Sequence, residues 1–244
     1  MDIGKEHFFS PSEIGEWIAC PTRWWKRRSG APRIAVEKKY MDFGTLFHDA
    51  IKEYYEVITE RPPTGVIEGT FKTILDRRLK DKRFEGMKQR IERCTRNFIK
   101  FETMRRRTWR QYKPTLVETK LAAEINGVRY VNIVDAYWEK DQHSVDWKTG
   151  AKNRITDIDR IQGTIGQMVL AAHGKICKKT TFVCLYTGMF LPMPRTSVEF
   201  VEGHVKDMVE CVRKRQFLKK RHYCSSCEFS LSCAFEDRGI CMWM

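Results

Sequence analysis

The stretch from Val128 to Gly150, VRYVNIVDAYWEKDQHSVDWKTG, constrains the fold more than any other part of the chain. It predicts two strands around a polar turn, with Asp135 on the first strand and Asp146 and Lys148 on the second. Side chains two positions apart on a strand point to the same face, so Asp146 and Lys148 share one face. Antiparallel pairing about a turn centred between residues 140 and 141 places Asp135 opposite Asp146, with Cβ atoms about 5 Å apart.

A second hairpin is predicted immediately upstream, because Asn126-Gly127 is a strong signal for a two-residue turn. Pairing about that turn places Glu118 beside Asp135. Three carboxylates in a row across three strands repel one another and destabilise the sheet. A divalent cation would compensate this repulsion. The alternative is that each acid lies on the solvated face of an antiparallel meander.

The segment Asp146-Trp147-Lys148-Thr149-Gly150, after a strand that carries Asp135, resembles the active-site signature of the PD-(D/E)XK nuclease superfamily. It is most similar to the RecB-like branch, which includes the CRISPR-associated exonucleases with an iron–sulfur cluster. The resemblance implies a metal-dependent DNA nuclease, an exonuclease that hydrolyses phosphodiester bonds at DNA ends or in single strands. It implies that Mg²⁺ or Mn²⁺ is held by four groups: His48, Asp135, Asp146 and the backbone carbonyl of Trp147. Lys148 would then position the attacking water or stabilise charge on the phosphate, and Glu118 would be an additional ligand or a neighbour of the ligands.

The histidine of this expected site comes from an upstream helix, predicted from Phe43 to about Ile58 with Asp42 as its cap. Gly44 and His48 are four residues apart and therefore lie on one face of that helix. A glycine inside a helix costs about 1 kcal/mol, so its presence indicates close approach of a neighbouring element. The segment resembles the G-x-x-x-H motif of RecB-like nucleases, in which the histidine is a metal ligand. Without that resemblance, His48 reads as a packed or exposed side chain.

Downstream of the hairpins, Ile155 to Ala172 is predicted as a helix and Lys178–Tyr186 as a buried strand. The right-handed crossover rule makes that strand parallel to the strand of Asp146. We expect an edge strand over Thr196–Val201 and a final amphipathic helix over Gly203–Lys220. The resulting order, α-β-β-β-α-β in a mixed sheet flanked by helices, is that of the PD-(D/E)XK core.

Gln167 stands where the RecB-like branch carries a Q-x-x-x-Y motif, but position 171 is alanine. The resemblance therefore transfers a catalytic role to Gln167 alone. The alternative is an ordinary solvent-facing glutamine on a helix.

The charge of the chain points to a polyanionic partner, since 45 Lys and Arg against 31 Asp and Glu give a net charge of +14. DNA is the first expectation and an anionic membrane surface the second. From Phe71 to Tyr112 the pattern is helical and strongly basic, and we expect it, including Arg105-Arg106-Arg107, to contact phosphates instead of forming only a solvated face. No apolar run has the length of a transmembrane helix, and Met1–Ser10 has no signal-peptide core. A cytoplasmic location is therefore expected.

Nine cysteines without a secretory signal indicate a reducing compartment, in which thiols bind metals or stay free. Cys224, Cys227 and Cys233 form a C-x-x-C-x₅-C pattern, and Cys20 precedes Pro21 at the end of a predicted helix that begins with a capping box at Ser10. Three clustered thiolates can bind one metal centre, with the fourth ligand from elsewhere. This arrangement resembles the [4Fe–4S] site of the CRISPR-associated exonucleases and of AddB-type nuclease domains. Structural zinc is the alternative cofactor.

The expected organisation is a single RecB-like nuclease domain over residues 1–244 with four parts. These are N-terminal helices with Cys20 and His48 (1–60), a basic helical insertion (61–113), the nuclease core (114–200) and a C-terminal helix with the cysteine cluster (201–244). The resemblance implies a role in phage or archaeal DNA processing, recombination or CRISPR adaptation, with a possible protein partner. The leading alternative is a non-catalytic DNA-binding subunit of such a complex that keeps the fold and cluster. A structural zinc protein that binds RNA is a third interpretation.

Overall fold

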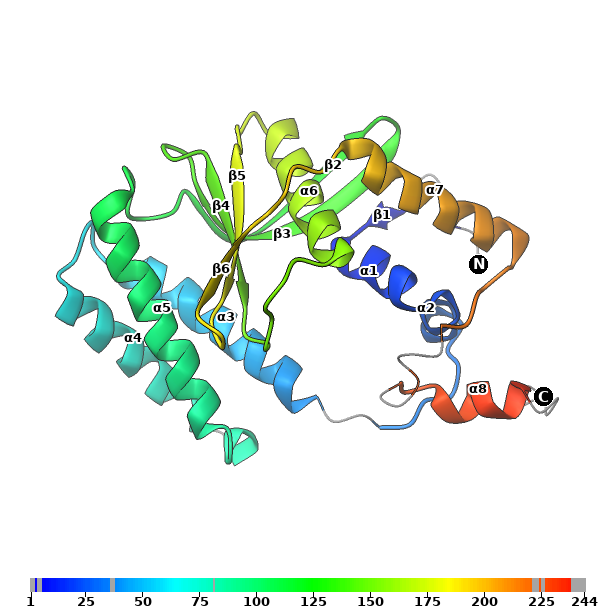
Figure 1. The fold of residues 1–244 in the computed structure, drawn as a ribbon, viewed down its shortest axis with the longest axis horizontal. Coiled ribbons are helices and arrows are strands. Elements are labelled where there is room, and N and C mark those ends of the chain that lie inside the picture. Colours follow the sequence, from blue (N-terminus) through cyan, green and yellow to red (C-terminus); the bar gives the residue numbers. More distant parts are fainter. Residues whose placement is uncertain are drawn as a thin grey trace.

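A computed structural model of the protein describes residue 3 and residues 6–35, 38–80, 82–220, 224 and 227–237. Its centre is a mixed sheet of six strands with helices on both faces (Figure 1). The strands are β1 (Phe8–Phe9), β2 (Leu116–Ile125), β3 (Val128–Trp138), β4 (His143–Lys148), β5 (Lys179–Cys184) and β6 (Met189–Pro192). Strand β3 is the longest and pairs with β1, β2 and β4, while β5 and β6 extend the sheet beyond β4.

Two groups of helices cover the sheet and form two separate cores. The first group is α3 (Lys39–Val57), α4 (Thr64–Arg78) and α5 (Lys88–Thr108), with a short 3-10 turn η1 (Lys82–Phe84) between α4 and α5. Their aromatic side chains pack on Trp138 and Trp147 of the sheet. The second group is α1 (Pro11–Ala19), α2 (Pro21–Arg28), α6 (Asp157–Ala172) and α7 (Val198–Lys214), which packs around Tyr130 of β3. A last helix, α8 (Ser230–Asp237), lies near α2 (Figure 1).

The strand register agrees with the expectation from the two turns. Ala136 pairs with Val145 between β3 and β4, and with Val117 between β2 and β3. The Asn126-Gly127 turn has positive φ at both residues (52° and 74°), as a two-residue hairpin turn of type I′ requires. Continued by one residue, this register puts the three predicted acids in one row across β2, β3 and β4. Strand β5 runs parallel to β4, with α6 as the crossover, so that prediction is also confirmed.

The start of α1 follows the expected signal in part. The Ser10 hydroxyl accepts a hydrogen bond from the Glu13 backbone N–H at 3.2 Å, and Pro11 occupies the first turn. The Glu13 carboxylate instead accepts from the Trp24 indole N–H at 3.3 Å, so the reciprocal half of the capping box is replaced by a contact to α2. The helix ends at Ala19, which leaves Cys20 in extended conformation between two helices.

The expected edge strand over Thr196–Val201 is wrong. The chain turns back directly after β5 through Gly188 (φ 76°), so β6 (Met189–Pro192) is the edge strand and α7 begins at Val198. Asp42 is also not the cap of its helix, because α3 begins at Lys39. Its carboxylate lies 3.2 Å from the guanidinium of Arg83 in η1.

Arg105 corrects the interpretation of the basic helix. Its side chain is fully buried and pairs with Glu102, also fully buried, at 2.7 Å. The guanidinium lies 4.5 Å from the ring centres of Tyr112 and Trp138. Arg105 therefore holds α5 to the sheet and has no surface to offer to a phosphate, whereas Arg107 is exposed.

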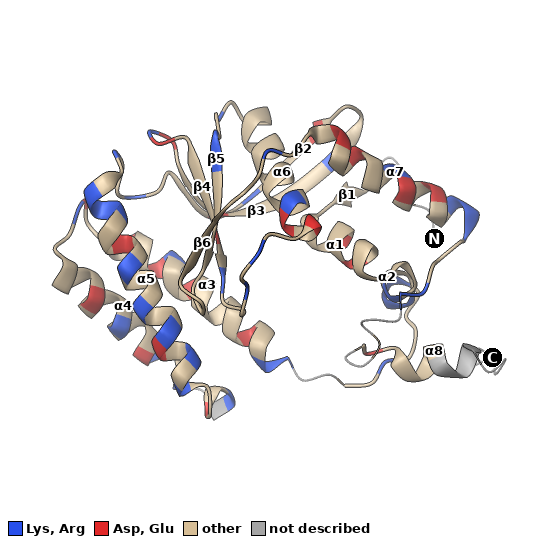
Figure 2. Ribbon diagram, viewed as in Figure 1, with Lys and Arg blue, Asp and Glu red and all other residues tan. Residues whose placement is uncertain are grey.

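Charges are unevenly distributed over the remaining surface. Lys and Arg follow α4 and α5 and gather around α2, whereas α7 carries several acids (Figure 2). None of the helices in the described part of the chain is long and apolar enough to cross a bilayer.

Candidate active site

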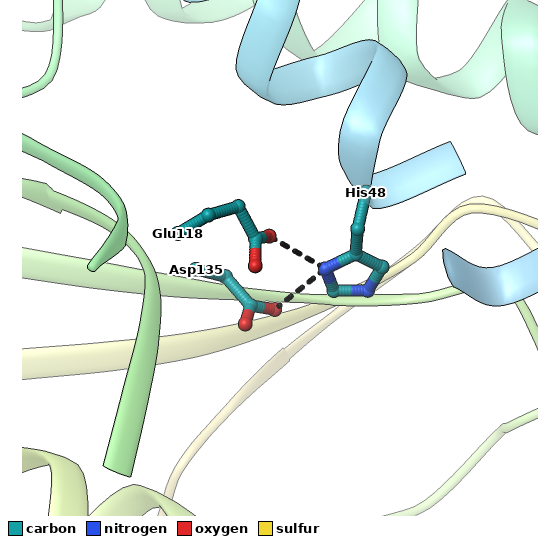
Figure 3. Close-up of side chains that lie close together, drawn as sticks. All are labelled: His48, Glu118 and Asp135. Carbon is teal, nitrogen blue, oxygen red and sulfur yellow. Dashed lines mark hydrogen bonds and ion pairs between the residues drawn. The ribbon is translucent and has the colours of Figure 1, made fainter. Parts of the chain in front are cut away.

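Three side chains from three elements meet beside the sheet (Figure 3). His48 comes from α3, Glu118 from β2 and Asp135 from β3, and one ligand atom of each lies within 4.8 Å of the other two. His48 Nδ1 lies 2.7 Å from Glu118 Oε1 and 3.7 Å from Asp135 Oδ2. Asp135 is only 8% exposed, so its carboxylate needs compensation by neighbouring groups.

The backbone of β4 closes the fourth side of this cluster. The Trp147 backbone N–H donates to Asp135 Oδ2 at 2.8 Å, and the Trp147 carbonyl lies 3.1 Å from His48 Nε2. Gly44, one helical turn before His48, makes this approach possible. A Cβ atom at Gly44 would lie 3.3 Å from Thr149 Oγ1, so the close approach predicted from the glycine is confirmed.

Glu118 reaches the cluster through a strained backbone. Its φ of 43° lies in the left-handed region, which costs a residue other than glycine about 1–3 kcal/mol. Val117 and Thr119 on either side keep the same register with β3, so no residue is inserted. The strain is confined to the residue whose carboxylate contacts His48.

Asp146 and Lys148 form a second, adjoining group. Lys148 Nζ lies 2.6 Å from Asp146 Oδ1. Gln162 of α6 bridges the pair, since its Nε2 donates to Asp146 and its Oε1 accepts from Lys148 Nζ at 2.7 Å. The Asp146 carboxylate therefore faces Lys148 and Gln162 and adjoins the cluster of His48, Glu118 and Asp135.

Gln167 does not reach this site. Its side chain donates to Thr180 Oγ1 at 3.1 Å, and Thr180 is paired with Ser144 at the start of β4. Helix α6 runs back along the sheet, so Gln162 is level with Lys148 and Gln167 lies more than one helical turn farther on. The glutamine at the site is Gln162, which the motif comparison did not identify. The sequence marks it only as a polar residue between Ile161 and Ile165, which are both buried.

Arg90 of α5 holds the loop that follows Lys148. Its Nη1 donates to the Thr149 carbonyl at 2.8 Å, and its guanidinium lies 4.8 Å and 4.3 Å from the ring centres of Tyr40 and Tyr186. Among so many basic residues, nothing in the sequence distinguishes Arg90. It connects the basic helix to the loop between β4 and α6.

The electrostatics of the site favour a proton on His48 when no cation is bound. Burial alone would lower the pKa of His48, but the carboxylates of Asp135 and Glu118 raise it to about 9. Burial raises the pKa of Asp135, and burial with the nearby Asp135 charge raises that of Asp146 to about 6 although Lys148 opposes the change. Burial would lower the pKa of Lys148, yet Asp146 and Asp135 raise it.

An open groove of about 620 Å³ contains the cluster. The N-terminal end of α1, the middle of α3, strands β2 and β3 and the first turns of α6 line it. Its residues include Ser12, Thr45, Lys120, Ile133 and Ile158. The carboxylates of Glu118 and Asp135 and the imidazole of His48 therefore line an open groove.

The four predicted cluster cysteines come from both ends of the chain into one region. Cys233 packs with Cys227 in a small core with Ala31 and Phe229. The Cys227 backbone N–H donates to the Cys224 carbonyl at 3.2 Å. Burial raises the pKa of the Cys227 thiol, and Cys20 lies near enough to contribute to the same increase. Among the described residues no cysteine forms a disulfide.

A family profile agrees with this geometry. The profile of the PD-(D/E)XK nuclease superfamily matches residues 8–234. A solved structure from Eubacterium rectale, titled "Putative exonuclease", resembles the chain with a TM-score of 0.47 and 12% identity, over 90% of this chain and 85% of that one. No curated protein matches the sequence. Since the profile spans both helix groups, the whole sheet and every residue of the cluster, the chain belongs to the PD-(D/E)XK nuclease superfamily.

Proposed function

We propose that the protein is a metal-dependent deoxyribonuclease of the RecB-like branch, an exonuclease that acts on DNA ends or single strands. The observation that carries the proposal is the convergence of His48, Glu118 and Asp135 beside the Asp146–Lys148 pair. The net charge of +14 supports a polyanionic substrate. A protein partner in recombination or CRISPR adaptation is part of the same proposal.

The donor groups fit a hard divalent cation. Carboxylate and carbonyl oxygens with one imidazole suit Mg²⁺ or Mn²⁺, and two buried carboxylates next to each other gain most from a compensating charge. The proposed ligands are His48, Asp135, Asp146 and the carbonyl of Trp147, with Glu118 as a further carboxylate. When bound, the ion supplies a water of lowered pKa and stabilises negative charge on the attacked phosphate.

The residues beside the cation site have separate roles in this proposal. The raised pKa of Lys148 keeps its ammonium group charged, which favours electrostatic stabilisation of the phosphate over general-base catalysis. Gln162 and Asp146 fix the position of that ammonium group. Arg90 holds the loop immediately after it.

Mn²⁺ binding is expected to tighten about tenfold per pH unit between roughly pH 7 and pH 9, because His48 must lose its proton to become a ligand. The folded-state pKa of His48 is raised from 6.5 to about 9. Its proton therefore stabilises the metal-free fold below pH 6.5, and this stability is lost as the pH rises through about 9. Calorimetric titration with Mn²⁺ at several pH values, and thermal unfolding in EDTA over the same range, measure both effects.

His48→Ala should bind Mn²⁺ more weakly and lose the proton linkage. His173→Gln, at the far end of α6, is the matched control and should behave as wild type. Mn²⁺ affinity that is independent of pH in the wild-type protein would contradict the assignment of His48 as a ligand.

The second part of the proposal is a structural [4Fe–4S] cluster held by Cys20, Cys224, Cys227 and Cys233. Four thiols from both ends of the chain suit a site that needs four thiolates. Such a cluster would join α1 and α2 to α8 and to the segment before it. Closing a loop of that length restricts the unfolded chain by about 4–5 kcal/mol, by analogy with a long-range disulfide.

Cys227→Ala is therefore expected to give colourless protein with a large loss of thermal stability, whereas Cys177→Ser, outside this region, should resemble wild type. Freshly purified wild-type protein should contain about four iron atoms per chain and show a broad absorbance band at about 400 nm. If anaerobically prepared protein contains zinc and no iron, the four cysteines form a zinc site and not an iron–sulfur cluster. Unchanged stability in Cys227→Ala would rule out the cross-link.

A further inference from the structure

On one half of the β2–β3 hairpin, one face of the sheet carries exposed side chains. The first helix group packs on the part of the sheet that contains Trp138, Val145 and Trp147, beyond the row of acids. On the other side of that row, Lys120, Ala122 and Ile133 are exposed. Ile133 is 52% exposed, although it is an isoleucine in the middle of the longest strand. We call Lys120, Ala122, Val131 and Ile133 the hairpin platform.

The platform continues directly from the candidate active site. Lys120 and Ile133 are register partners, two residues beyond the Glu118 and Asp135 positions on their respective strands. Both line the groove that also contains His48, Glu118 and Asp135. Two residues along a strand span about 6.6 Å, which is close to the distance between successive phosphates of an extended strand.

The platform combines an uncompensated cation with apolar surface. Within the described residues, Lys120 has no ion pair and no side-chain hydrogen bond, unlike Arg129 nearby, which pairs with Glu124. Ile133 and Val131 supply apolar contact area beside it, and Ile158 of α6 lines the same groove. An exposed apolar patch with one free cation suits a ligand that has both phosphates and apolar faces.

We propose that the hairpin platform selects an unpaired DNA strand, with Lys120 on a phosphate and Ile133 against the adjacent base or sugar. Duplex DNA presents its phosphates outward and keeps its base faces stacked inside, so it cannot use Ile133. An unpaired strand can place a base face on that surface. This inference rests on the proposed nuclease function, since the platform is useful only if DNA enters the groove.

Binding can be tested without cleavage, in EDTA, by fluorescence anisotropy of a labelled single-stranded oligonucleotide and of the blunt duplex with the same sequence. Wild type should bind the single strand more tightly than the duplex. Ile133→Glu should weaken single-strand binding about tenfold or more, and Lys120→Gln about threefold to tenfold with a reduction of about 0.7 in the salt slope. Ile133→Glu should not change duplex binding by more than about twofold, because duplex DNA cannot place a base face on Ile133.

Two matched controls test whether position matters or only residue type. Ile176→Glu replaces another exposed isoleucine (60% exposed), after α6, and Lys140→Gln replaces an exposed lysine in the β3–β4 turn. Both should bind as wild type. The inference is overturned if Ile133→Glu and Lys120→Gln match these controls, or if Ile133→Glu weakens duplex and single-strand binding equally.

The inference and the proposed function can fail separately. Loss of single-strand binding in Ile133→Glu, in a protein that cleaves no DNA with Mn²⁺, would support the platform and contradict the nuclease proposal. If the wild-type protein cleaves DNA and the platform variants bind and cleave normally, the nuclease proposal is supported and the platform is contradicted.

Discussion

Lys148→Ala is expected to lower the rate of DNA cleavage by about 10²–10³-fold, because the variant loses the fixed positive charge beside the attacked phosphate. Lys148 Nζ is held by Asp146 at 2.6 Å and by Gln162 at 2.7 Å, so its ammonium group has a fixed position. DNA binding should stay close to wild type, since affinity comes from many distributed Lys and Arg contacts. Single-turnover cleavage of end-labelled DNA with Mn²⁺, together with anisotropy in EDTA, separates the two quantities.

Lys140→Ala is the control for this experiment, because it removes an exposed lysine from the turn between β3 and β4. It should cleave at the wild-type rate. A Lys148→Ala protein that also cleaves at that rate would remove Lys148 from the catalytic machinery.

Glu102→Ala is expected to destabilise the fold by about 3–5 kcal/mol, because it leaves the buried Arg105 guanidinium without its counter-charge. Both side chains are fully buried, and Arg105 is surrounded by the rings of Tyr112 and Trp138. Chemical denaturation followed by circular dichroism measures the loss. The double variant Glu102→Leu with Arg105→Met should recover most of it, since apolar side chains of similar volume can replace a buried ion pair.

Arg107 lies two residues after Arg105 on α5, and its side chain is exposed. Arg107→Ala should therefore change the free energy of unfolding by less than about 0.5 kcal/mol. Equal effects of Glu102→Ala and Arg107→Ala would contradict the structural role of the buried pair.

The sheet and the row of acids were predictable because local signals determine them. A two-residue turn at Asn126-Gly127 fixes which residues of β2 and β3 pair, and that pairing places Glu118 next to Asp135. His48 could be placed near them only by resemblance, since no local rule specifies which helix packs beside which strand. The strained φ of Glu118 is invisible in the sequence, because a glutamate in a strand normally adopts an extended conformation.

The errors come from long-range packing. Gln162 and Gln167 lie on the same helix, and only the docking of α6 on β4 and β5 decides which one meets Lys148. Arg105 looks like its neighbours Arg106 and Arg107 in a basic run, and its burial depends on Tyr112 and Trp138 elsewhere in the chain. Composition indicates the charge of the molecule but does not identify which charges are available to DNA.

Cleavage of end-labelled DNA by the wild-type protein, with Mn²⁺ and with EDTA, is the most direct test of the proposed active site. Cleavage is expected with the metal and not with EDTA. Asp135→Asn should bind DNA but leave it intact, because the substitution removes the negative charge of a proposed metal ligand. The Asp135 side chain is only 8% exposed and lies in the cluster with His48 and Glu118. Intact DNA in every wild-type reaction would instead favour a non-catalytic DNA-binding subunit, and cleavage by Asp135→Asn at the wild-type rate would show that the nuclease site lies elsewhere.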